Sequence, residues 1–277
     1  MGRISNTIGL AKVSWRVLRH DRELLFIPIL SFLSAVGVIV VLAIPMIALL
    51  DTSSTGSGED STVSPAVWVL GVVAALSLSL VSVFFNGALV AGAHERLSGG
   101  DPTVRSALSR AVQRLPGLVP WALLTATVGL ILQALRNRAG FLARFVLGFV
   151  GAAWEIATFL VVPAIIIDDQ GAIDGLKESA GLLKKTWGEN LAARVGFGLL
   201  GIVAIIPAVI IMAIAASLGG PILVLGVIVV VGWVATVIVV LTALNAIFQT
   251  ALYLYATTGV SPAGFEQSSL GDSFGQR

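Results

Sequence analysis

The sequence contains no cysteine, only two histidines and few charged residues. Asp, Glu, Lys and Arg make up 12% of its 277 residues, whereas a typical soluble domain has about 25%. Without cysteine, disulfides, thiolate metal sites and cysteine nucleophiles are excluded, and His20 and His94 cannot by themselves form a histidine-rich metal site. So few charges cannot cover a water-exposed surface, which excludes an ordinary soluble enzyme.

Several functional motifs are missing as well. The chain has no phosphate-binding loop, no complete metalloprotease motif and no serine nucleophile elbow. No polar module gathers basic residues with aromatics, as a nucleic-acid binder would. We therefore expect no enzymatic activity, no cofactor, no metal and no nucleic-acid partner.

Apolar residues are abundant: they make up 57% of the chain, and the mean hydropathy is +0.98. A membrane-spanning helix needs about 20 apolar residues, and charge-free windows of that length recur along the sequence. The longest window, from Val195 to Phe265, must turn near residues 217–221, where Gly and Pro cluster. Six spans are predicted, at about residues 24–50, 66–93, 117–135, 145–167, 195–217 and 221–246.

Basic residues orient these spans. Most Lys and Arg lie before span 1, between spans 2 and 3, and between spans 4 and 5. The positive-inside rule then places both termini of this multi-pass protein on the cytoplasmic side of the cell membrane. Arg136, Arg138 and Arg144 are exceptions to this rule. They lie in the turn between spans 3 and 4, which the even number of spans places outside.

A cytoplasmic amphipathic segment precedes each of the three predicted hairpins. The segments lie within residues 1–23, 104–115 and 173–187, and Asp101-Pro102 is expected to start the second helix. Such helices lie in the headgroup plane with cations toward anionic lipid. The predicted partner is therefore the bilayer with anionic headgroups at the cytoplasmic face. The alternative is a docking surface for another protein. Residues 259–277 are predicted to form a disordered cytoplasmic tail.

Glu155 is the only charged residue in predicted span 4. An ionisable group near the middle of the bilayer costs at least about 2.5 kcal/mol, so it should face the bundle and be either partnered or protonated. Gly148, Gly151 and Thr158 share its helix face, and Thr125 of span 3 is its expected partner. Two interpretations remain open: a proton-coupling or cation-binding carboxylate, and a protonated Glu in one interhelical hydrogen bond.

Polar residues also follow the inner halves of spans 2 and 6. Their stripes contain Ser79, Ser82 and Asn86, and Thr242, Asn245 and Gln249. Both helices run in the same direction, so the stripes are expected at similar depth. They form either interhelical hydrogen bonds or a hydrated inner vestibule. Kinks are expected at Pro28, Pro45 and Pro207.

Parts of the sequence are similar to known families. The runs 161–168, 172–179 and 182–188, together with 12–18 and 23–28, resemble an uncharacterised prokaryotic family of six-span membrane proteins. Residues 160–205 more distantly resemble the membrane domain fused to some glycerophosphodiester phosphodiesterases. The chain has no catalytic half of such an enzyme, so the hydrolase activity is not carried over to it. The resemblance implies six spans and the helices before the spans.

The expected fold is an all-α integral membrane domain over residues 24–258, with six spans in three hairpins. The expected function is a non-enzymatic membrane scaffold or partner-binding protein, which binds another protein or a second copy of itself. The alternative is a small proton- or cation-coupled transporter that uses Glu155. The candidate polar residues within the membrane are Glu155, Thr125, Asn86, Asn245 and Gln249.

Overall fold

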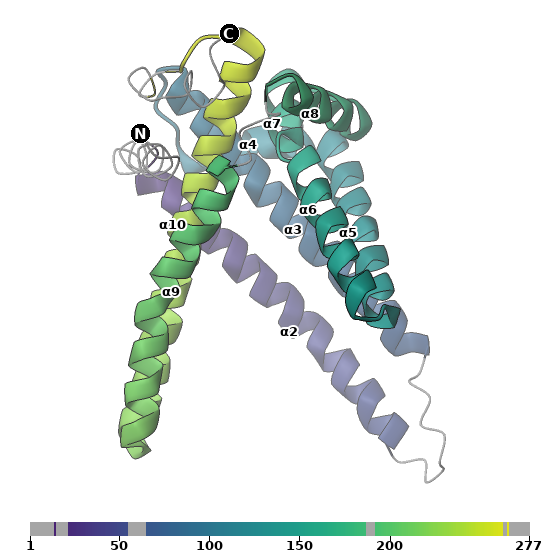
Figure 1. Ribbon diagram of the computed structural model, residues 1–277, viewed down its shortest axis with the longest axis vertical. Helices are drawn as coiled ribbons and strands as arrows, with labels where there is room; N and C mark the ends of the chain where they lie inside the picture. The colour runs from purple at the N-terminus through teal and green to yellow at the C-terminus, as the bar shows by residue number, and fades with distance from the viewer. Residues whose placement is uncertain (1–13, 15–21, 55–64, 187–191, 263–264, 266–277) are drawn as a thin grey trace. The chain divides into compact units, whose positions relative to one another are not determined.

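The computed structural model describes residues 14, 22–54, 65–186, 192–262 and 265. Within these residues every regular element is a helix (Figure 1). The elements are η1 (Arg22–Leu25), α2 (Phe26–Ser54), α3 (Pro65–Leu97), α4 (Val104–Gln113), α5 (Leu115–Arg138), α6 (Phe141–Ala157), α7 (Val161–Asp168), α8 (Ala172–Thr186), α9 (Ala192–Leu218) and α10 (Gly220–Thr258).

Five segments of the described chain are long and apolar enough to cross a membrane, which indicates a multi-pass membrane protein. They are Glu23–Leu49, Pro65–Leu97, Leu115–Arg138, Phe141–Asp168 and Gly220–Thr258. The remaining predicted span corresponds to α9, in which Val203–Leu218 forms a shorter apolar helix. The sixth crossing therefore stays a prediction.

Helix α10 extends well past residue 246, where the sixth membrane span was predicted to end. No Gly or Pro interrupts the chain between residue 246 and Gly259, so nothing stops the helix. Gly259 ends it in the left-handed conformation, at φ 72°, and its N–H donates to the Tyr255 carbonyl at 2.8 Å. The end of a hydrophobic run is thus not the end of this helix.

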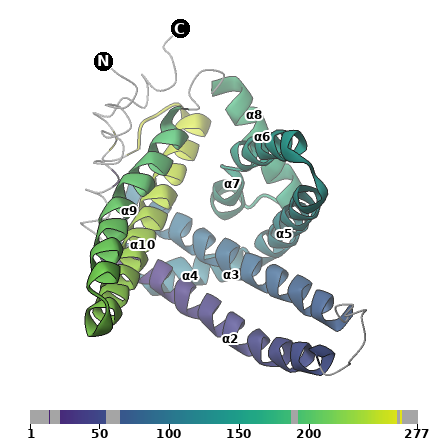
Figure 2. The same cartoon turned by 60° about the horizontal axis from the view of Figure 1, so that its bottom comes forward.

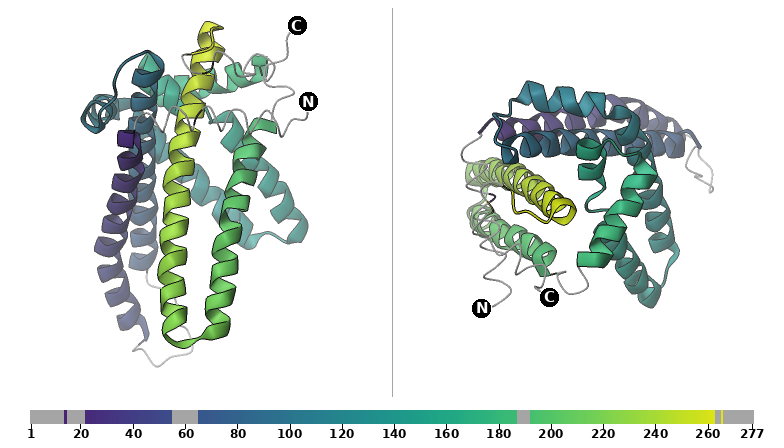
Figure 3. Two further views of the ribbon diagram at one scale, coloured as in Figure 1. Left: turned by 90° about the vertical axis from the view of Figure 1, so that its left-hand side faces the viewer. Right: turned by 90° about the horizontal axis from the view of Figure 1, so that it is seen from above.

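The chain forms two compact units, and each is described by itself. The first unit comprises residues 1–28, 89–107 and 180–277, and the second comprises 29–88 and 108–179. In the first unit, α9 and α10 form a long hairpin (Figures 1 and 3). Its turn uses Gly219 and Gly220 at φ 65° and 54°, which only glycine adopts without strain.

The core of the first unit lies at the far end of α10 from that turn. Residues 246–253 of α10 are all buried, as are Leu24, Ile27 and residues 87–93 at the end of α3, of which 89–93 belong to this unit. Gly92 makes the packing possible, because a Cβ there would lie 2.5 Å from the Leu24 side chain and 3.5 Å from that of Ala107. In the region predicted as a tail, Phe265 is fully buried.

In the second unit, α2 and α3 run side by side (Figures 2 and 3), and α5 and α6 form a hairpin. Trp121 and Trp154 stack between α5 and α6 with their ring centroids 6.2 Å apart. Residues 161–166 of α7 are all buried. Gly117 of α5 allows that burial, because a Cβ there would lie 2.7 Å from the Ile165 side chain.

Helices occupy two of the three segments that were predicted before the hairpins. Helix α4 begins at Val104, so Thr103 caps it and the expected cap at Asp101 is wrong. In α8 the buried face consists of Ala172, Gly175, Ser179 and Leu183. The predicted apolar stripe is only partly buried, since Ile173 is 51% exposed. Of the first segment, the structure describes Ser14 and, at its end, Arg22 and Glu23, which belong to η1; the rest lies outside the described residues.

The helices containing the proline residues expected to cause kinks are continuous. Pro45 lies inside α2 and Pro207 inside α9, and Pro28 is in the first turn of α2. The proline that interrupts a span is Pro163, which was not among those expected.

Candidate functional site

Predicted span 4 is interrupted at residues 158–160, between α6 and α7. Pro163 explains the position of the break. It has no N–H to donate to the carbonyl of Phe159, and its ring collides with that carbonyl in a regular helix. The chain tightens there instead, with hydrogen bonds from Phe159 N–H to the Ile156 carbonyl at 3.1 Å and from Val161 N–H to the Thr158 carbonyl at 3.2 Å.

Ser179 of α8 fills the break. Its hydroxyl donates to the Ala157 carbonyl at 2.7 Å and accepts from the Leu160 N–H at 3.0 Å. In a regular helix these two backbone groups would bond to residues 161 and 156. Ser179 is fully buried, so one hydroxyl replaces two lost backbone hydrogen bonds where water has no access. Backbone groups inside a membrane need such internal partners.

Helix α8 is held against α7 by further contacts. Gly175 lies against Val161 and Ala164, where a Cβ would come within 3.4 and 3.6 Å of their side chains. At the α7–α8 connection, Asp169 adopts the left-handed conformation at φ 56° and forms an ion pair with Arg114. The Gln170 amide donates to the Glu178 carboxylate. These contacts fix the height of Ser179 relative to the break.

Glu155 lies two residues before the end of α6, immediately ahead of the break. Its side chain is exposed, and among the described residues it forms no hydrogen bond or ion pair; only its backbone carbonyl accepts, from the Thr158 hydroxyl at 3.4 Å. The sequence predicted a carboxyl group facing the bundle. Within the described part of its own unit no side chain covers it, so its orientation in the complete bundle stays a prediction.

Thr125, the expected partner of Glu155, bonds elsewhere. Its hydroxyl lies 3.2 Å from that of Ser79 in α3, and it donates to the Trp121 and Ala122 carbonyls, each at 3.1 Å. Ser79 also donates to the Ala122 carbonyl at 2.8 Å. Thr125 therefore joins α5 to α3 and contributes nothing to a Glu155 site.

The predicted small-residue face of α6 is divided. Gly148 is exposed beside Glu155, but Gly151 is buried beneath the guanidinium of Arg136. Arg136 donates to the Leu147 carbonyl at 3.2 Å, and a Cβ on residue 151 would lie 2.6 Å from Nη2 of Arg136. Thr158 donates to the Trp154 carbonyl at 2.8 Å.

The other candidate residues are distributed over both units. Asn86 is half-buried in the second unit, while Asn245 is exposed and Gln249 is buried in the first. Because these residues belong to units that are described separately, the expected meeting of the two polar stripes stays a prediction.

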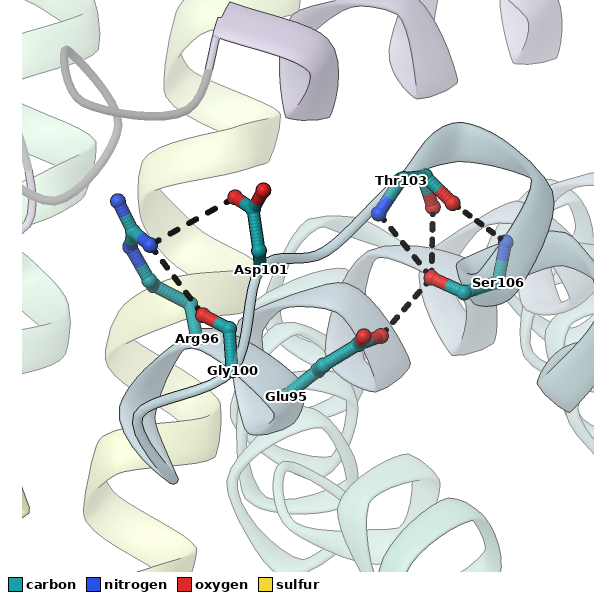
Figure 4. A network of polar contacts seen from close by, with 6 residues as sticks. All are labelled: Glu95, Arg96, Gly100, Asp101, Thr103 and Ser106. Carbon is teal, nitrogen blue, oxygen red and sulfur yellow. Dashed lines mark hydrogen bonds and ion pairs between the residues drawn. The ribbon is translucent and has the colours of Figure 1, made fainter.

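A polar network surrounds the start of α4 in the first unit (Figure 4). Thr103 and Ser106 bond each other's backbone N–H through their hydroxyls, at 3.1 and 3.0 Å, and Ser106 also donates to Glu95 at 2.8 Å. Glu23 accepts from the Val104 N–H at 3.3 Å. These oxygens satisfy the free N–H groups of the helix start, so the network stabilises the connection between α3 and α4.

Comparison with known proteins places the chain in a family. Residues 66–265 match the Family of unknown function (DUF6159). The chain belongs to this family. The DUF6159 segment includes Glu155, the α6–α7 break and Ser179. No curated protein matches the chain. Family membership therefore supports a membrane protein without fixing its activity.

Within the DUF6159 segment, sequence reasoning missed three residues that shape the site. Pro163 was visible in a predicted span and could have been read as a break. Ser179 could not have been found, because it lies on a polar helix far along the chain from the groups it bonds. Arg136 was assigned to an outer turn, and no pattern indicated that its side chain reaches Gly151.

Proposed function

We propose that this protein is a non-enzymatic membrane protein that binds a partner through the exposed face of α6 that carries Glu155. The observation that supports the proposal is the exposed carboxyl group of Glu155, which has no side-chain partner among the described residues. At the expected depth of Glu155, an ionisable group costs at least about 2.5 kcal/mol and is stabilised by another polar group. A partner that supplies this polar group would bind more tightly and more specifically, because it stabilises the Glu155 carboxyl group.

The partner we propose is a transmembrane helix that carries a basic or hydrogen-bond-donating side chain. Such a donor complements the carboxyl group. Ala152 and Gly148, one and two turns before Glu155 respectively, are exposed and small. Small residues let two helices approach closely in a membrane. The same face of α6 therefore offers both a close contact and an anchoring charge.

Site-specific photo-crosslinking in native membranes tests this proposal. A photoreactive amino acid at residue 152 faces the same side as Glu155, whereas one at residue 153 is equally exposed on the opposite side of α6. We expect a discrete protein adduct from position 152 and none from position 153. The adduct should decrease severalfold in Glu155→Leu, and the crosslinked helix should contain a donor residue at the contact.

The controls define what contradicts the proposal. Ala153→Leu places a leucine on the other face of α6. It should leave the adduct from position 152 unchanged. Equal adducts from both positions, or an adduct that Glu155→Leu does not weaken, would contradict partner binding. A crosslink to a second copy of this chain identifies a homo-oligomer, and Glu155 then needs a donor from the second copy.

A coupled transporter is the second candidate, and the α6–α7 break favours it. Interrupted membrane helices often line transport sites, and this break begins three residues after Glu155. A transporter needs water at the carboxyl group. The chain has no cysteine, so a single Ala152→Cys variant reports water access. Rapid reaction with a membrane-impermeant thiol reagent favours transport, and protection favours a covered interface.

The finer topology also belongs to this proposal. We propose six spans in three hairpins in the cell membrane, both termini in the cytoplasm, and anionic lipid at the cytoplasmic face. The basic segments between the hairpins support this orientation, which a reporter fused after Arg277 would test. The resemblance of residues 160–205 to a phosphodiesterase membrane domain supports membrane insertion. It gives no support for hydrolase activity, because it covers only the membrane domain.

A further inference from the structure

The turn between α5 and α6 carries three arginines that the partner-binding proposal does not use. Arg136, Arg138 and Arg144 are all exposed. The only acidic residue of the α5–α6 hairpin is Glu155, which lies at the end of α6 far from the turn and forms no ion pair with these arginines. They also run against the positive-inside pattern, which calls for a separate explanation.

Two of these arginines are held in place by backbone carbonyls. Arg144 donates through Nε to the Ala139 carbonyl at 3.0 Å, and Arg136 donates through Nη2 to the Leu147 carbonyl at 3.2 Å. A guanidinium has five N–H donors, so within the described chain most donors of both groups stay available. Gly151 provides the space that Arg136 occupies along α6.

An exposed apolar surface begins next to these guanidinium groups. Phe141 is 86% exposed, Phe145 65% and Phe149 64%, and they follow one side of α6 away from the turn. Phe145 and Phe149 are packed edge to face, with ring centroids 4.9 Å apart. The surface is therefore cationic at the turn and aromatic along the helix.

We propose that the α5–α6 turn binds the phosphate group of an anionic membrane phospholipid, whose acyl chains lie along Phe141, Phe145 and Phe149. Guanidinium groups bind phosphate oxygens with paired hydrogen bonds. The order of charge followed by apolar surface matches a phospholipid from headgroup to tail. This site explains why the turn retains arginines, and its headgroup contacts do not involve Glu155.

Lipid-specific fluorescence quenching tests the site on the full chain. Because the chain has no cysteine, a fluorophore on Asn137→Cys, an exposed residue of the turn, reports locally. The protein is reconstituted in phosphatidylcholine vesicles with a small fraction of spin-labelled phosphatidylglycerol or spin-labelled phosphatidylcholine. We expect phosphatidylglycerol to quench more strongly by roughly fivefold, the local enrichment that a single basic residue supplies.

Two double variants separate this site from general charge effects. Arg138→Gln with Arg144→Gln should bring the quenching ratio close to one. Arg105→Gln with Arg110→Gln removes the same charge from exposed positions on α4 and should leave the ratio unchanged. Arg138→Lys with Arg144→Lys keeps the charge and should retain a reduced preference, which shows that the turn is still folded.

Other outcomes overturn the proposal. Equal quenching by the two lipids in the wild-type chain contradicts a phospholipid site at the turn. A preference that survives the glutamine double variant shows that the arginines do not cause it. Inorganic phosphate lacks acyl chains and should not reduce the preference. Displacement by phosphate at about millimolar concentration would assign the site to the free ion and overturn the lipid assignment.

Discussion

Two proline-containing apolar segments of this chain respond to proline in opposite ways. In α6–α7, Pro163 coincides with a break of the helix, whereas α9 continues through Pro207. Both prolines remove one backbone donor and crowd the carbonyl four residues earlier. The residue type therefore does not decide whether a membrane helix breaks.

The neighbouring helices account for the difference. At the α6–α7 break, Ser179 bonds the Ala157 carbonyl and the Leu160 N–H, so the interruption leaves neither group without a partner. Beside Pro207 the neighbour is α10, which donates the Trp233 Nε1–H to the Ala204 carbonyl at 2.8 Å. Helix α8 supplies hydrogen-bond partners where the backbone hydrogen bonds of the span are interrupted. Helix α10 donates a hydrogen bond to a helix that stays continuous.

Removal of the Ser179 hydroxyl should have the largest effect. In Ser179→Ala, the buried Leu160 N–H and the partly buried Ala157 carbonyl lose their partner, at a cost of roughly 2–4 kcal/mol. The thermal unfolding midpoint of the purified chain, followed by circular dichroism in detergent, should fall by several degrees. Ser217→Ala is the matched control, because the exposed Ser217 hydroxyl bonds only the Ile214 carbonyl of its own helix.

A second substitution then tests the role of Pro163. Adding Pro163→Ala to Ser179→Ala restores a backbone donor and lets α6 and α7 join, so part of the lost stability should return. If the double variant melts no higher than Ser179→Ala, Pro163 is not what requires the serine.

Closing the space between α9 and α10 should have an intermediate effect. A Cβ on residue 226 would collide with the side chain of Ala215, so Gly226→Ala should cost about 1–3 kcal/mol through overpacking. Gly232→Ala is the control on the same helix, because nothing lies within 4 Å of its Cβ position. Adding Ala215→Gly should recover the melting midpoint of Gly226→Ala, and no recovery would place the strain elsewhere.

The loss of one interhelical hydrogen bond should have the smallest effect. Trp233→Phe removes the donor to the Ala204 carbonyl and keeps an aromatic ring, so we expect about 0.6 kcal/mol, the average for such bonds in membranes. Trp68→Phe is the control, since Trp68 is 70% exposed. A loss as large as that of Ser179→Ala would show that α9 depends on its neighbour as strongly as the α6–α7 break does.

The sequence predicted the helices better than their contacts. The span boundaries for α3 and α5 agree with the structure within a few residues, because an apolar run and its charged flanks are local properties. The pairing of Glu155 with Thr125 failed for a different reason. Equal depth in two helices does not fix how each is rotated, and Ser79 takes the Thr125 hydroxyl.

Composition and charge spacing by themselves determined that this chain forms apolar helices suited to a bilayer, because hydrophobic length is read along one segment at a time. Only the tertiary structure decided that Ser179 supports the interrupted span, that Arg136 covers Gly151 and that Thr125 bonds to α3 rather than to Glu155. Each of these depends on the rotation of a helix and on a neighbour distant in sequence, which no local pattern encodes.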